Sequence, residues 1–456
     1  MKYALLTENG GVTYDQLEEM VNNAMKNFYN REIAFIITDN NLESIVYYIG
    51  CLKKRIVPLL LHKNLPLKSL VKMIENYNPY YIILPQKLEF RYSGYYELDA
   101  FETYRVYYKK YGKLNVIYPE LALLLSTSGS IGSAKCVRIS YDNLRANTLS
   151  ICEALRITGE DMAITTLPMD YTYGLSIINT HLYKHACVVL NTTSIIYRAF
   201  WNKIKKYNCT TMGGVPYTYE VMNKLNLLEN LKCFNYITQA GGRLDPIIAK
   251  KIAELCKKAG VKFIIMYGQT EATARISYLP WEYIEGKWDS IGITIPGGNM
   301  YVIDEQGNRI EKYNTEGEIV YRGSNVTMGY AYSKDDLVKG DERNGILKTG
   351  DIGYYDEKHF FYVTGRKKRF IKMYGNRVNL DELERRLREE GYSILCVGKD
   401  DNLVIIFENQ KINLHIKNKL HLMGIPVHKV KIVEITKRPL NSSNKTDYFK
   451  LEQMFL

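Results

Sequence analysis

The chain has 456 residues, a formal net charge of +12 and 46% hydrophobic residues, a length that predicts about two to four domains or subdomains around a sizeable core. It contains no run of about 18 or more apolar residues, and Glu8 comes too early for a signal peptide, so we expect a cytoplasmic protein without a membrane span. Its eight cysteines include no CxxC pair and predict reduced, buried thiols, while the scattered lysines predict no nucleic-acid partner.

The first part of the chain alternates short apolar runs with segments of helical periodicity. The apolar runs predict strands at residues 33–37, 57–61 and 80–84, and the spacing between them predicts helices at 42–54 and 67–76. The same alternation resumes with strand-like segments at 163–167, 187–190, 234–237 and 263–266. Because strands that alternate with helices pair mostly in parallel, we expect an α/β fold class with a largely parallel sheet.

From about Met300 the pattern changes to short strands between Gly and Asn turns, at residues 300–303 and 318–321, which predicts a small β-rich subdomain. A final α+β segment begins near Lys367 and contains a charged helix at 380–390, a strand pair and a helix at 414–423. We therefore expect a large N-terminal domain, residues 1–366, and a small mobile C-terminal lid domain, residues 367–456.

The strongest motif is a loop that follows the apolar strand at residues 123–125. It contains hydroxyl side chains, glycines and Lys135. Glycine lets successive N–H groups point at one anion, and a lysine adds a full charge, so the loop is suited to phosphate. It is not a Walker A loop, and a polar surface loop is the alternative interpretation. Residues 127–135, TSGSIGSAK, resemble the signature TSGSTGxPK of the adenylate-forming superfamily, which holds acyl- and aryl-CoA synthetases, peptide-synthetase adenylation domains and firefly luciferase.

This resemblance implies a set of residues that bind the phosphates of ATP: Thr127, Ser128, Gly129, Ser130, Gly132 and Lys135. Two positions depart from the signature. Ile131 stands where the superfamily has Thr and removes one hydroxyl, and Ala134 stands where it usually has Pro. The departures predict a loop that is slower or binds less tightly than in its relatives.

Two later segments resemble further motifs of the superfamily, in the same order along the chain. Residues 239–244, QAGGRL, resemble the glycine-rich turn that lies against adenine, which implies ATP-binding roles for Gly241, Gly242 and Arg243. Residues 267–271, YGQTE, match the superfamily's YGxTE. That match implies an AMP site made by Tyr267, which stacks on the purine, Gly268, Gln269, the catalytic Thr270 at the α-phosphate, and the Mg²⁺ ligand Glu271. As isolated segments they are also typical of strand-to-helix turns, with Thr270 as an N-cap.

The following motifs imply a ribose site and a hinge. Residues 317–323 and Gly329–Tyr330 resemble a stretch that we interpret as scaffold rather than catalysis. Asp351 in KTGD would accept the ribose hydroxyls. Residues 364–378 resemble the hinge segment GRxxxxIKxxGxRV, which implies four roles: ribose or phosphate contact by Arg366, the hinge at Lys368, a catalytic face with Lys372, and a thiol tunnel at Gly375. Alone, this segment is typical of a solvated basic strand.

Near the C-terminus, residues 438–447 resemble the superfamily's PrxxxGKxD loop. The resemblance implies that Lys445 is catalytic in the adenylation step, where a cation between the attacking carboxylate and the α-phosphate offsets their repulsion. Asn444 replaces the usual Gly, and because Asn tolerates left-handed backbone angles we expect the turn to survive. A lone lysine in such a position is otherwise typical of solvated surface.

The resemblance places the acyl pocket around Asp170, Tyr171, Met212 and Gly213. Residues 167–174, LPMDYTYG, align with LPxxHxxG of CoA synthetases, which makes Asp170 a charge before a helix, or with FDxS of amino-acid-activating relatives, in which Asp170 holds the substrate ammonium. We favour an acid without an amine. A separate pair, His181 and His185, lies one helical turn apart, but no third ligand accompanies it and we expect no metal site there.

The resemblance implies an AMP-forming ligase that uses ATP and Mg²⁺ to make an acyl-adenylate from a small carboxylic acid and transfers the acyl group to a thiol. The thiol would belong to CoA or to the phosphopantetheine of a separate carrier protein. An acyl- or aryl-CoA synthetase is the favoured hypothesis. The alternatives are a stand-alone amino-acid adenylation enzyme that loads a carrier protein, and a nucleotide-binding protein whose catalysis is weakened by Ile131 and Asn444.

Overall fold

The computed structural model describes residues 2–29, 31–126, 135–374, 376–410, 415–423, 425–441 and 444–456. Contacts divide the chain into two compact units, a larger one (Met1–Asn299 with Tyr321–Leu347) and a smaller one (Met300–Val320 with Lys348–Leu456). Within the described ranges, every helix is too short or too polar to cross a bilayer. All eight cysteines are unpaired, as predicted, and seven of them are buried; Cys233 is exposed.

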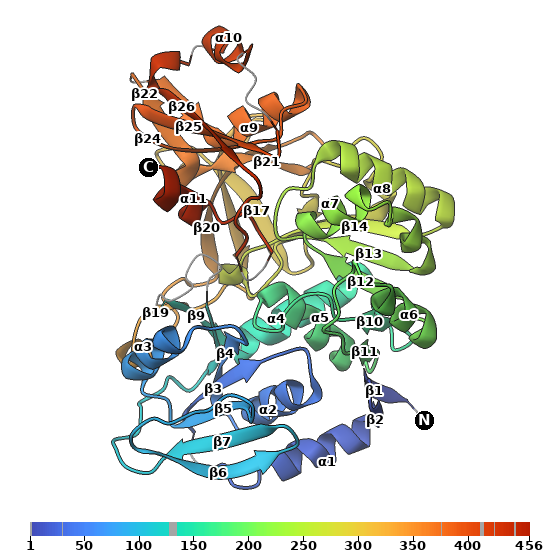
Figure 1. The fold of residues 1–456 in the computed structure, drawn as a ribbon, viewed down its shortest axis with the longest axis vertical. Helices are drawn as coiled ribbons and strands as arrows, with labels where there is room; N and C mark the ends of the chain where they lie inside the picture. The colour runs from blue at the N-terminus through green and yellow to red at the C-terminus, as the bar shows by residue number, and fades with distance from the viewer. Residues whose placement is uncertain are drawn as a thin grey trace. The chain divides into compact units, whose positions relative to one another are not determined.

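A nine-stranded sheet forms one layer of the larger unit (Figure 1). Its order is β16 (Ile293–Thr294), β15 (Ser277–Leu279), β14 (Lys262–Tyr267), β13 (Tyr236–Gln239), β12 (Thr211–Gly214), β10 (Met162–Ile164), β11 (Cys187–Val189), β1 (Tyr3–Thr7) and β2 (Gly10–Thr13). The strands from β14 to β1 are parallel, and the outer strands are antiparallel. The predicted largely parallel sheet is confirmed, although β13 lies two residues further along the chain than the apolar run at 234–237.

An eight-stranded sheet takes seven of its strands from residues 33–140 and the eighth, β19, from a later part of the chain. Its order is β19 (Gly329–Ala331), β9 (Cys136–Ser140), β8 (Leu121–Ser126), β4 (Val57–His62), β3 (Ile33–Thr38), β5 (Tyr81–Pro85), β7 (Tyr104–Lys109) and β6 (Tyr95–Phe101). Strands β3, β4, β5 and β8 are parallel, and β8 pairs antiparallel with β9. The apolar runs at 33–37, 57–61 and 80–84 therefore form central strands, as predicted, because they are buried on both faces.

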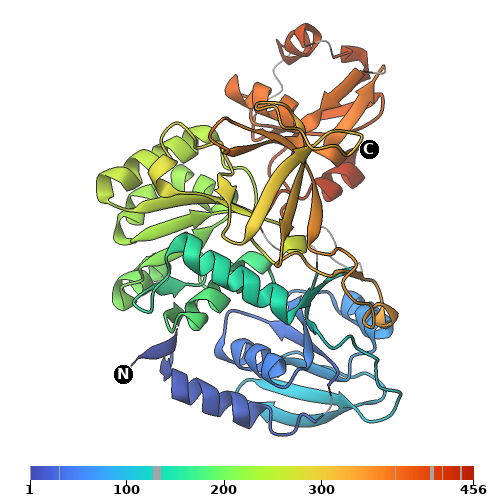
Figure 2. The same ribbon diagram turned by 180° about the vertical axis from the view of Figure 1, so that it is seen from behind.

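Helices pack between and outside the two sheets. The inner layer is α1 (Tyr14–Ala24), α2 (Leu42–Lys53), α4 (Tyr141–Leu155) and α5 (Thr172–Tyr183), and α4 crosses the unit prominently in Figure 2. One apolar core joins both sheets through this layer, with members such as Ile36, Ile178 and Val188. The other helices are α3 (Leu67–Tyr77), α6 (Arg198–Tyr207), α7 (Pro216–Lys224) and α8 (Pro246–Ala259), with the short 3₁₀ helices η1 (Leu228–Cys233), η2 (Thr270–Ala272), η3 (Trp281–Tyr283) and η4 (Lys334–Asp336).

Local side-chain chemistry sets several of these helix ends. Asn41 accepts a hydrogen bond from the Ser44 N–H at the start of α2, which satisfies one of the free N–H groups of the first turn. Helix α8 has Asp245 as its N-cap, Pro246 at its first position and Gly260 in the left-handed region (φ +72°) at its end. These signals explain where α2 begins and where α8 begins and ends.

In its described residues, the smaller unit consists of strands, three α-helices and two 3₁₀ helices. Its four-stranded sheet has the order β17 (Gly298–Ile303), β18 (Gly317–Gly323), β20 (Ile346–Tyr355) and β21 (Phe361–Arg366). The rest consists of η5 (Lys367–Arg369), β22 (Phe370–Met373), β23 (Asn376–Asn379), α9 (Leu380–Glu389), β24 (Ile394–Lys399), β25 (Asn402–Glu408), α10 (His415–Leu422), η6 (Val427–Lys429), β26 (Val430–Ile435) and α11 (Tyr448–Phe455). The predicted β-rich segment and the two predicted helices are therefore confirmed.

Candidate active site

The predicted site residues of the larger unit gather at the carboxyl ends of four neighbouring parallel strands. Asp170 and Tyr171 follow β10, and Met212 and Gly213 lie in β12. After β13 come Gly241, Gly242 and Arg243, and at the end of β14 come Tyr267, Gly268, Gln269, Thr270 and Glu271. Since β10, β12, β13 and β14 are adjacent and parallel, these ends lie along one edge, where open α/β sheets bind ligands.

The two glycine-rich turns at this edge have different geometries. Gly241 has φ +88°, a left-handed conformation that favours glycine, and the Gln239 side chain donates to the Gly242 carbonyl across 2.9 Å. Gly268 is required by close approach, because a Cβ there would lie 1.7 Å from the Ala274 carbonyl oxygen. Arg243 is exposed beside its turn. Glycine therefore lets the backbone turn tightly directly after β13 and at the end of β14.

The YGxTE segment does not begin an α-helix. Thr270 opens the short helix η2, whose N-cap is Gln269 without a side-chain cap bond, so the interpretation of Thr270 as an N-cap is wrong. The Gln269 amide instead donates to the Tyr267 hydroxyl across 3.2 Å. Helix capping by Thr270 therefore does not account for the YGxTE segment.

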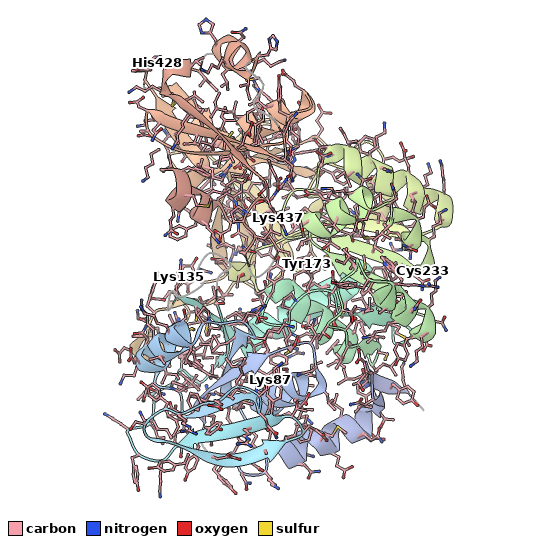
Figure 3. The ribbon with its side chains drawn as sticks, in the orientation of Figure 1. Lys87, Lys135, Tyr173, Cys233, His428 and Lys437 are labelled. Carbon is pink, nitrogen blue, oxygen red and sulfur yellow. The ribbon has the colours of Figure 1, made fainter. Side chains whose placement is uncertain are left out.

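Most of the predicted phosphate loop, Thr127, Ser128, Gly129, Ser130, Ile131, Gly132 and Ala134, lies outside the described residues. Its last residue, Lys135, is described and directly precedes β9. The Lys135 ammonium lies 3.7 Å from the centre of the Tyr330 ring, a cation–π contact (Lys135 is labelled in Figure 3). Tyr330 belongs to β19, which pairs with β9.

Tyr330 links this lysine to the end of β14. Its hydroxyl donates to Glu271 Oε1 across 2.7 Å, and burial followed by the charge of Glu271 raises the pKa of Tyr330 well above its usual value. Arg343 lies 4.6 Å from the same ring and donates to the Glu271 carbonyl oxygen across 3.2 Å. Two cations, a phenol and a carboxylate therefore meet at one place.

A buried arginine fixes the segment that supplies Tyr330 and Arg343. Arg138 of β9 has no exposed surface, and it donates to the carbonyls of Met328 and Tyr330, each across 3.1 Å, and to Glu342 Oε2 across 2.6 Å. The interpretation of Tyr330 as scaffold is thus incomplete, and Arg343 was missed. No motif distinguishes Arg343, which is half-buried, from the other arginines of the chain, because its partners are distant in the sequence.

This cluster fits a magnesium–triphosphate ligand by its donor set. Lys135 and Arg343 supply positive charge for phosphate oxygens, and Glu271 supplies one carboxylate. Among the described residues no group of three or more His, Cys, Asp or Glu side chains could hold a metal ion. A cation bound here would therefore take most of its ligands from phosphate and water, which Mg²⁺ accepts.

The acyl-pocket predictions separate into two groups. Gly213 lines a cavity together with Tyr173, whose hydroxyl bonds Thr238 on β13 and which is labelled in Figure 3. A Cβ at Gly213 would lie 3.0 Å from that hydroxyl, so glycine makes room for the tyrosine. Met212 and Tyr171 are buried and are not among the residues that line this cavity.

Asp170 lies apart from this cavity. It precedes Tyr171, the N-cap of α5, and is absent from the cavity lining. Burial raises the pKa of its carboxyl to about 7, with a further upward contribution from Asp39 and an opposing one from Lys63. Those two residues form an ion pair at 3.0 Å after β3 and β4. The Asp170 carboxyl therefore lies within electrostatic reach of this pair and outside the lining of the cavity.

The predicted histidine pair does not converge. His181 is buried, where Nδ1 bonds the Ile177 carbonyl across 2.8 Å and Nε2 lies 3.3 Å from the Tyr236 hydroxyl. Burial lowers the pKa of His181, which keeps the ring neutral. His185 instead packs against Tyr14, with ring centres 4.8 Å apart.

In the smaller unit, the predicted ribose residues form a pair. Asp351 on β20 is buried and opposite Arg366 on β21, and Arg366 Nε donates to Asp351 Oδ1 across 2.9 Å. The Thr349 hydroxyl accepts from the Asp351 N–H across 3.1 Å. The bond from Arg366 orients the Asp351 carboxylate, and the bond to Thr349 fixes the Asp351 backbone.

The predicted hinge residue lies between two anchored neighbours. Lys368 is exposed in η5, whereas the Arg366 N–H donates to Asp381 Oδ2 across 3.1 Å and Arg369 pairs with Asp381 at 2.6 Å. Arg369 also pairs with the buried Glu384 at 2.7 Å. Lys372 is exposed on β22, and Gly375 lies outside the described residues.

The predicted catalytic lysine of the C-terminal loop follows a left-handed residue. Asn444 has φ +57°, so the expectation that Asn preserves the turn is confirmed. The Lys445 N–H donates to Asn441 Oδ1 across 3.0 Å, and the Asn441 N–H donates back to the Lys445 carbonyl across 2.9 Å. The turn thus holds the backbone of Lys445 firmly.

Solved structures define the class of the fold. The O-succinylbenzoate coenzyme A synthetase of Bacillus subtilis, in complex with ATP and a magnesium ion, superposes with a TM-score of 0.76 at 20% identity, over 99% of this chain and 96% of that one. At this identity the likeness shows the fold, which is that of adenylate-forming enzymes.

Sequence comparison then gives the family. The model of the AMP-binding enzyme family matches residues 2–331, and the chain belongs to that family. Oxalate–CoA ligase of Saccharomyces cerevisiae is 26% identical over 268 residues, 58% of this chain and 48% of that protein. 2-Succinylbenzoate–CoA ligase of Geobacillus sp. is 26% identical over 407 residues, 84% of this chain and 78% of that protein. The chain thus spans about half the length of the first relative and most of the second.

Proposed function

We propose that this protein is an AMP-forming acid–thiol ligase that activates a small carboxylic acid with ATP and transfers the acyl group to CoA. The cluster of Lys135, Tyr330 and Glu271 at the end of β14 is the observation that supports this most directly. It combines a phosphate-binding cation with a carboxylate for a divalent cation. Bound Mg²⁺ would neutralise part of the phosphate charge.

The names of the relatives support the choice of acceptor. Two of them are CoA ligases, and the structural neighbour was solved with ATP and magnesium. We therefore propose ATP, Mg²⁺ and CoA as the reactants and cofactors of this chain. The phosphopantetheine of a carrier protein remains the second candidate for the thiol.

We propose that the residues at the strand ends bind the nucleotide. Tyr267 would stack on adenine beside the Gly241 turn, and Thr270 would donate to the α-phosphate. Asp351 and Arg366, paired through Nε, would accept and donate at the ribose and the phosphates. The loop at residues 127–132 and Lys135 would bind the β- and γ-phosphates.

We propose that residues 367–456 act as a lid that turns about Lys368. Arg366 and Arg369 are anchored on Asp381, and Lys368 is an exposed residue between them, which suits a pivot. Lys445 would offset the repulsion between carboxylate and α-phosphate in the first half-reaction. Lys372 and Gly375 would then serve the thiol transfer.

The substrate is proposed to be an acid without an amine. An ammonium needs a carboxylate beside it, whereas Asp170 faces Lys63 and Asp39 and lines no part of the cavity near Gly213. The charged residue that does line this cavity is a cation, Arg275. The left-handed Asn444 also supports an active enzyme over one with weakened catalysis.

The test is pyrophosphate release with ATP and Mg²⁺ over a panel of fatty, aryl and amino acids, with and without CoA. We expect release with a non-amino acid and faster turnover with CoA. Release that is indifferent to CoA but stimulated by a phosphopantetheinyl carrier protein would favour the carrier. ATP binding without release for every acid would refute the proposed activity.

A paired variant tests the role of Lys445. Lys445→Ala should lower pyrophosphate release by about 10²-fold or more while leaving thioester formation from supplied acyl-adenylate nearly unchanged, because the cation is needed only in the first half-reaction. Lys437→Ala, at an exposed lysine of the same unit (Figure 3), is the matched control and should change neither step. Equal loss of both steps would contradict the assignment.

A further inference from the structure

The guanidinium of Arg275 is buried without a charged partner. Arg275 precedes β15 and is 3% exposed. Its Cζ lies 3.9 Å from the centre of the Tyr173 ring, Nε lies 3.4 Å from Met266 Sδ, and Nη1 lies 3.4 Å from the Ala274 carbonyl oxygen. No Asp or Glu of the described residues forms an ion pair with it. These contacts are weak for a group with five N–H donors.

A buried guanidinium without a charged partner, such as that of Arg275, would be stabilised by a bound anion. An arginine stays protonated in proteins, and a buried charge is ordinarily paired or else destabilises the fold. Burial lowers the pKa of Arg275, and the opposing contributions come from the phenols of Tyr173 and Tyr171 rather than from a carboxylate. The chain itself thus offsets little of the free-energy cost of burying the charged guanidinium of Arg275.

Arg275 faces the cavity that Gly213 and Tyr173 line. This cavity contains about 340 Å³ of space between atoms, part of it open to solvent, and it has room for about one water molecule. A group that enters beside the guanidinium must therefore be small. The polar lining is completed by Ser176, Thr180, His181, Thr211, Tyr236 and Thr238.

The other polar groups of the cavity already have partners within the chain. The Tyr173 hydroxyl bonds Thr238, and Tyr236 and His181 bond each other, with His181 neutral. The lining contains no acidic residue, since Asp170 lies elsewhere. Arg275 is thus the group in this lining that a ligand would have to satisfy.

We propose that the acid activated by this protein has a second carboxylate, and that Arg275 binds it in this cavity. A carboxylate is small and planar, and its two oxygens match the fork of a guanidinium. The carboxylate that is activated would lie at the neighbouring strand ends, near Thr270. The inference rests on the proposed ligase activity and narrows its substrates to compact dicarboxylic acids.

The test compares diacids with their monomethyl esters, which are close in size but lack one charge. The probes are the straight diacids from oxalate to adipate and the three benzenedicarboxylates. Each diacid and its monomethyl ester are assayed separately for pyrophosphate release. We expect at least one diacid whose kcat/KM exceeds that of its monoester by about 10²-fold or more, because a site built for a polar group rejects the analogue that lacks it.

Two variants locate the effect. Arg275→Met should lower kcat/KM for that diacid by about 10²-fold while changing it for the monoester by less than about threefold, and Arg275→Lys should lie between. Arg145→Met, at an exposed arginine of α4, is the matched control and should leave both unchanged. An Arg275→Met protein that loses both substrates equally would show that Arg275 is structural and would overturn the inference.

A measurement on the unaltered protein covers the case in which the variants do not fold. With a non-hydrolysable ATP analogue present, the diacid should raise Tm more than the monoester does, because at equal concentration the ligand with the lower Kd stabilises the folded state more. Equal shifts, or a preference for monoacids in turnover, would overturn this inference and leave the ligase activity standing. An absence of pyrophosphate release with any acid would remove the ligase activity and this inference with it.

Discussion

The hydroxyl of Tyr330 provides the sharpest test of the nucleotide site. Tyr330→Phe removes the hydrogen bond to Glu271 and keeps the ring near Lys135 and Arg343. Glu271 would then lose the donor that orients its Oε1, and we expect weaker use of MgATP. The fold should be unaffected, because Arg138 holds the segment through backbone carbonyls.

The size of the effect follows from the geometry. The 2.7 Å bond joins a phenol to a carboxylate, and hydrogen bonds to charged groups contribute about 1.5–3 kcal/mol. Both side chains are partly exposed, so the lower figure of about 1.5 kcal/mol applies. Since about 1.4 kcal/mol is a factor of ten, kcat/KM for MgATP should fall about tenfold. Tyr330→Leu also loses the cation–π contacts and should fall about threefold to tenfold further.

The assay is pyrophosphate release at saturating acid, titrated with MgATP, for Tyr330→Phe, Glu271→Gln and the double variant. If the hydroxyl acts through Glu271, the double variant should resemble Glu271→Gln alone. Additive losses, or a Tyr330→Phe protein equal to the parent, would refute the reasoning, because either result would mean that the bond does not position Glu271.

Three further predictions concern the buried carboxylates and the C-terminal turn. Glu384→Ala should destabilise the smaller unit by about 3–5 kcal/mol in urea unfolding, because it breaks a buried ion pair with Arg369. Glu389→Ala, at an exposed glutamate, is the control and should change the free energy of unfolding by no more than about 0.5 kcal/mol. Similar unfolding midpoints for the two variants would contradict this prediction. Asn444→Gly should retain pyrophosphate release and Asn444→Val should lose most of it, since a β-branched residue is strained at φ +57°. Equal rates of pyrophosphate release in the two variants would rule out a role for the turn. Burial raises the pKa of Asp170 from 3.8 to about 7, so between these pH values the native state binds one more proton than the unfolded state, and Tm should fall as pH rises from 4 to 7. Asp170→Asn should flatten this part of the Tm–pH profile, and an unchanged slope in the variant would argue against the raised pKa.

The sequence by itself determined the local elements and their order. Strand β3 and helix α2 could be predicted because a continuous apolar run and a 3.6-residue period depend only on near neighbours. Motif order placed Tyr267 and Glu271 directly after one such run, and β14 ends there. The left-handed Asn444 could be expected for the same reason, since backbone preference is a property of the residue.

Only the tertiary structure decided which distant side chains meet. Tyr330 and Arg343 contact Glu271 across 59 and 72 residues of chain, and Arg275, just before β15, contacts the ring of Tyr173 in α5. Periodicity shows which face of a strand is buried but not which other strand lies beside it. A charge partner, a cavity or the direction in which Asp170 faces depends on that choice of neighbours, and the neighbours are set by the packing of the whole unit.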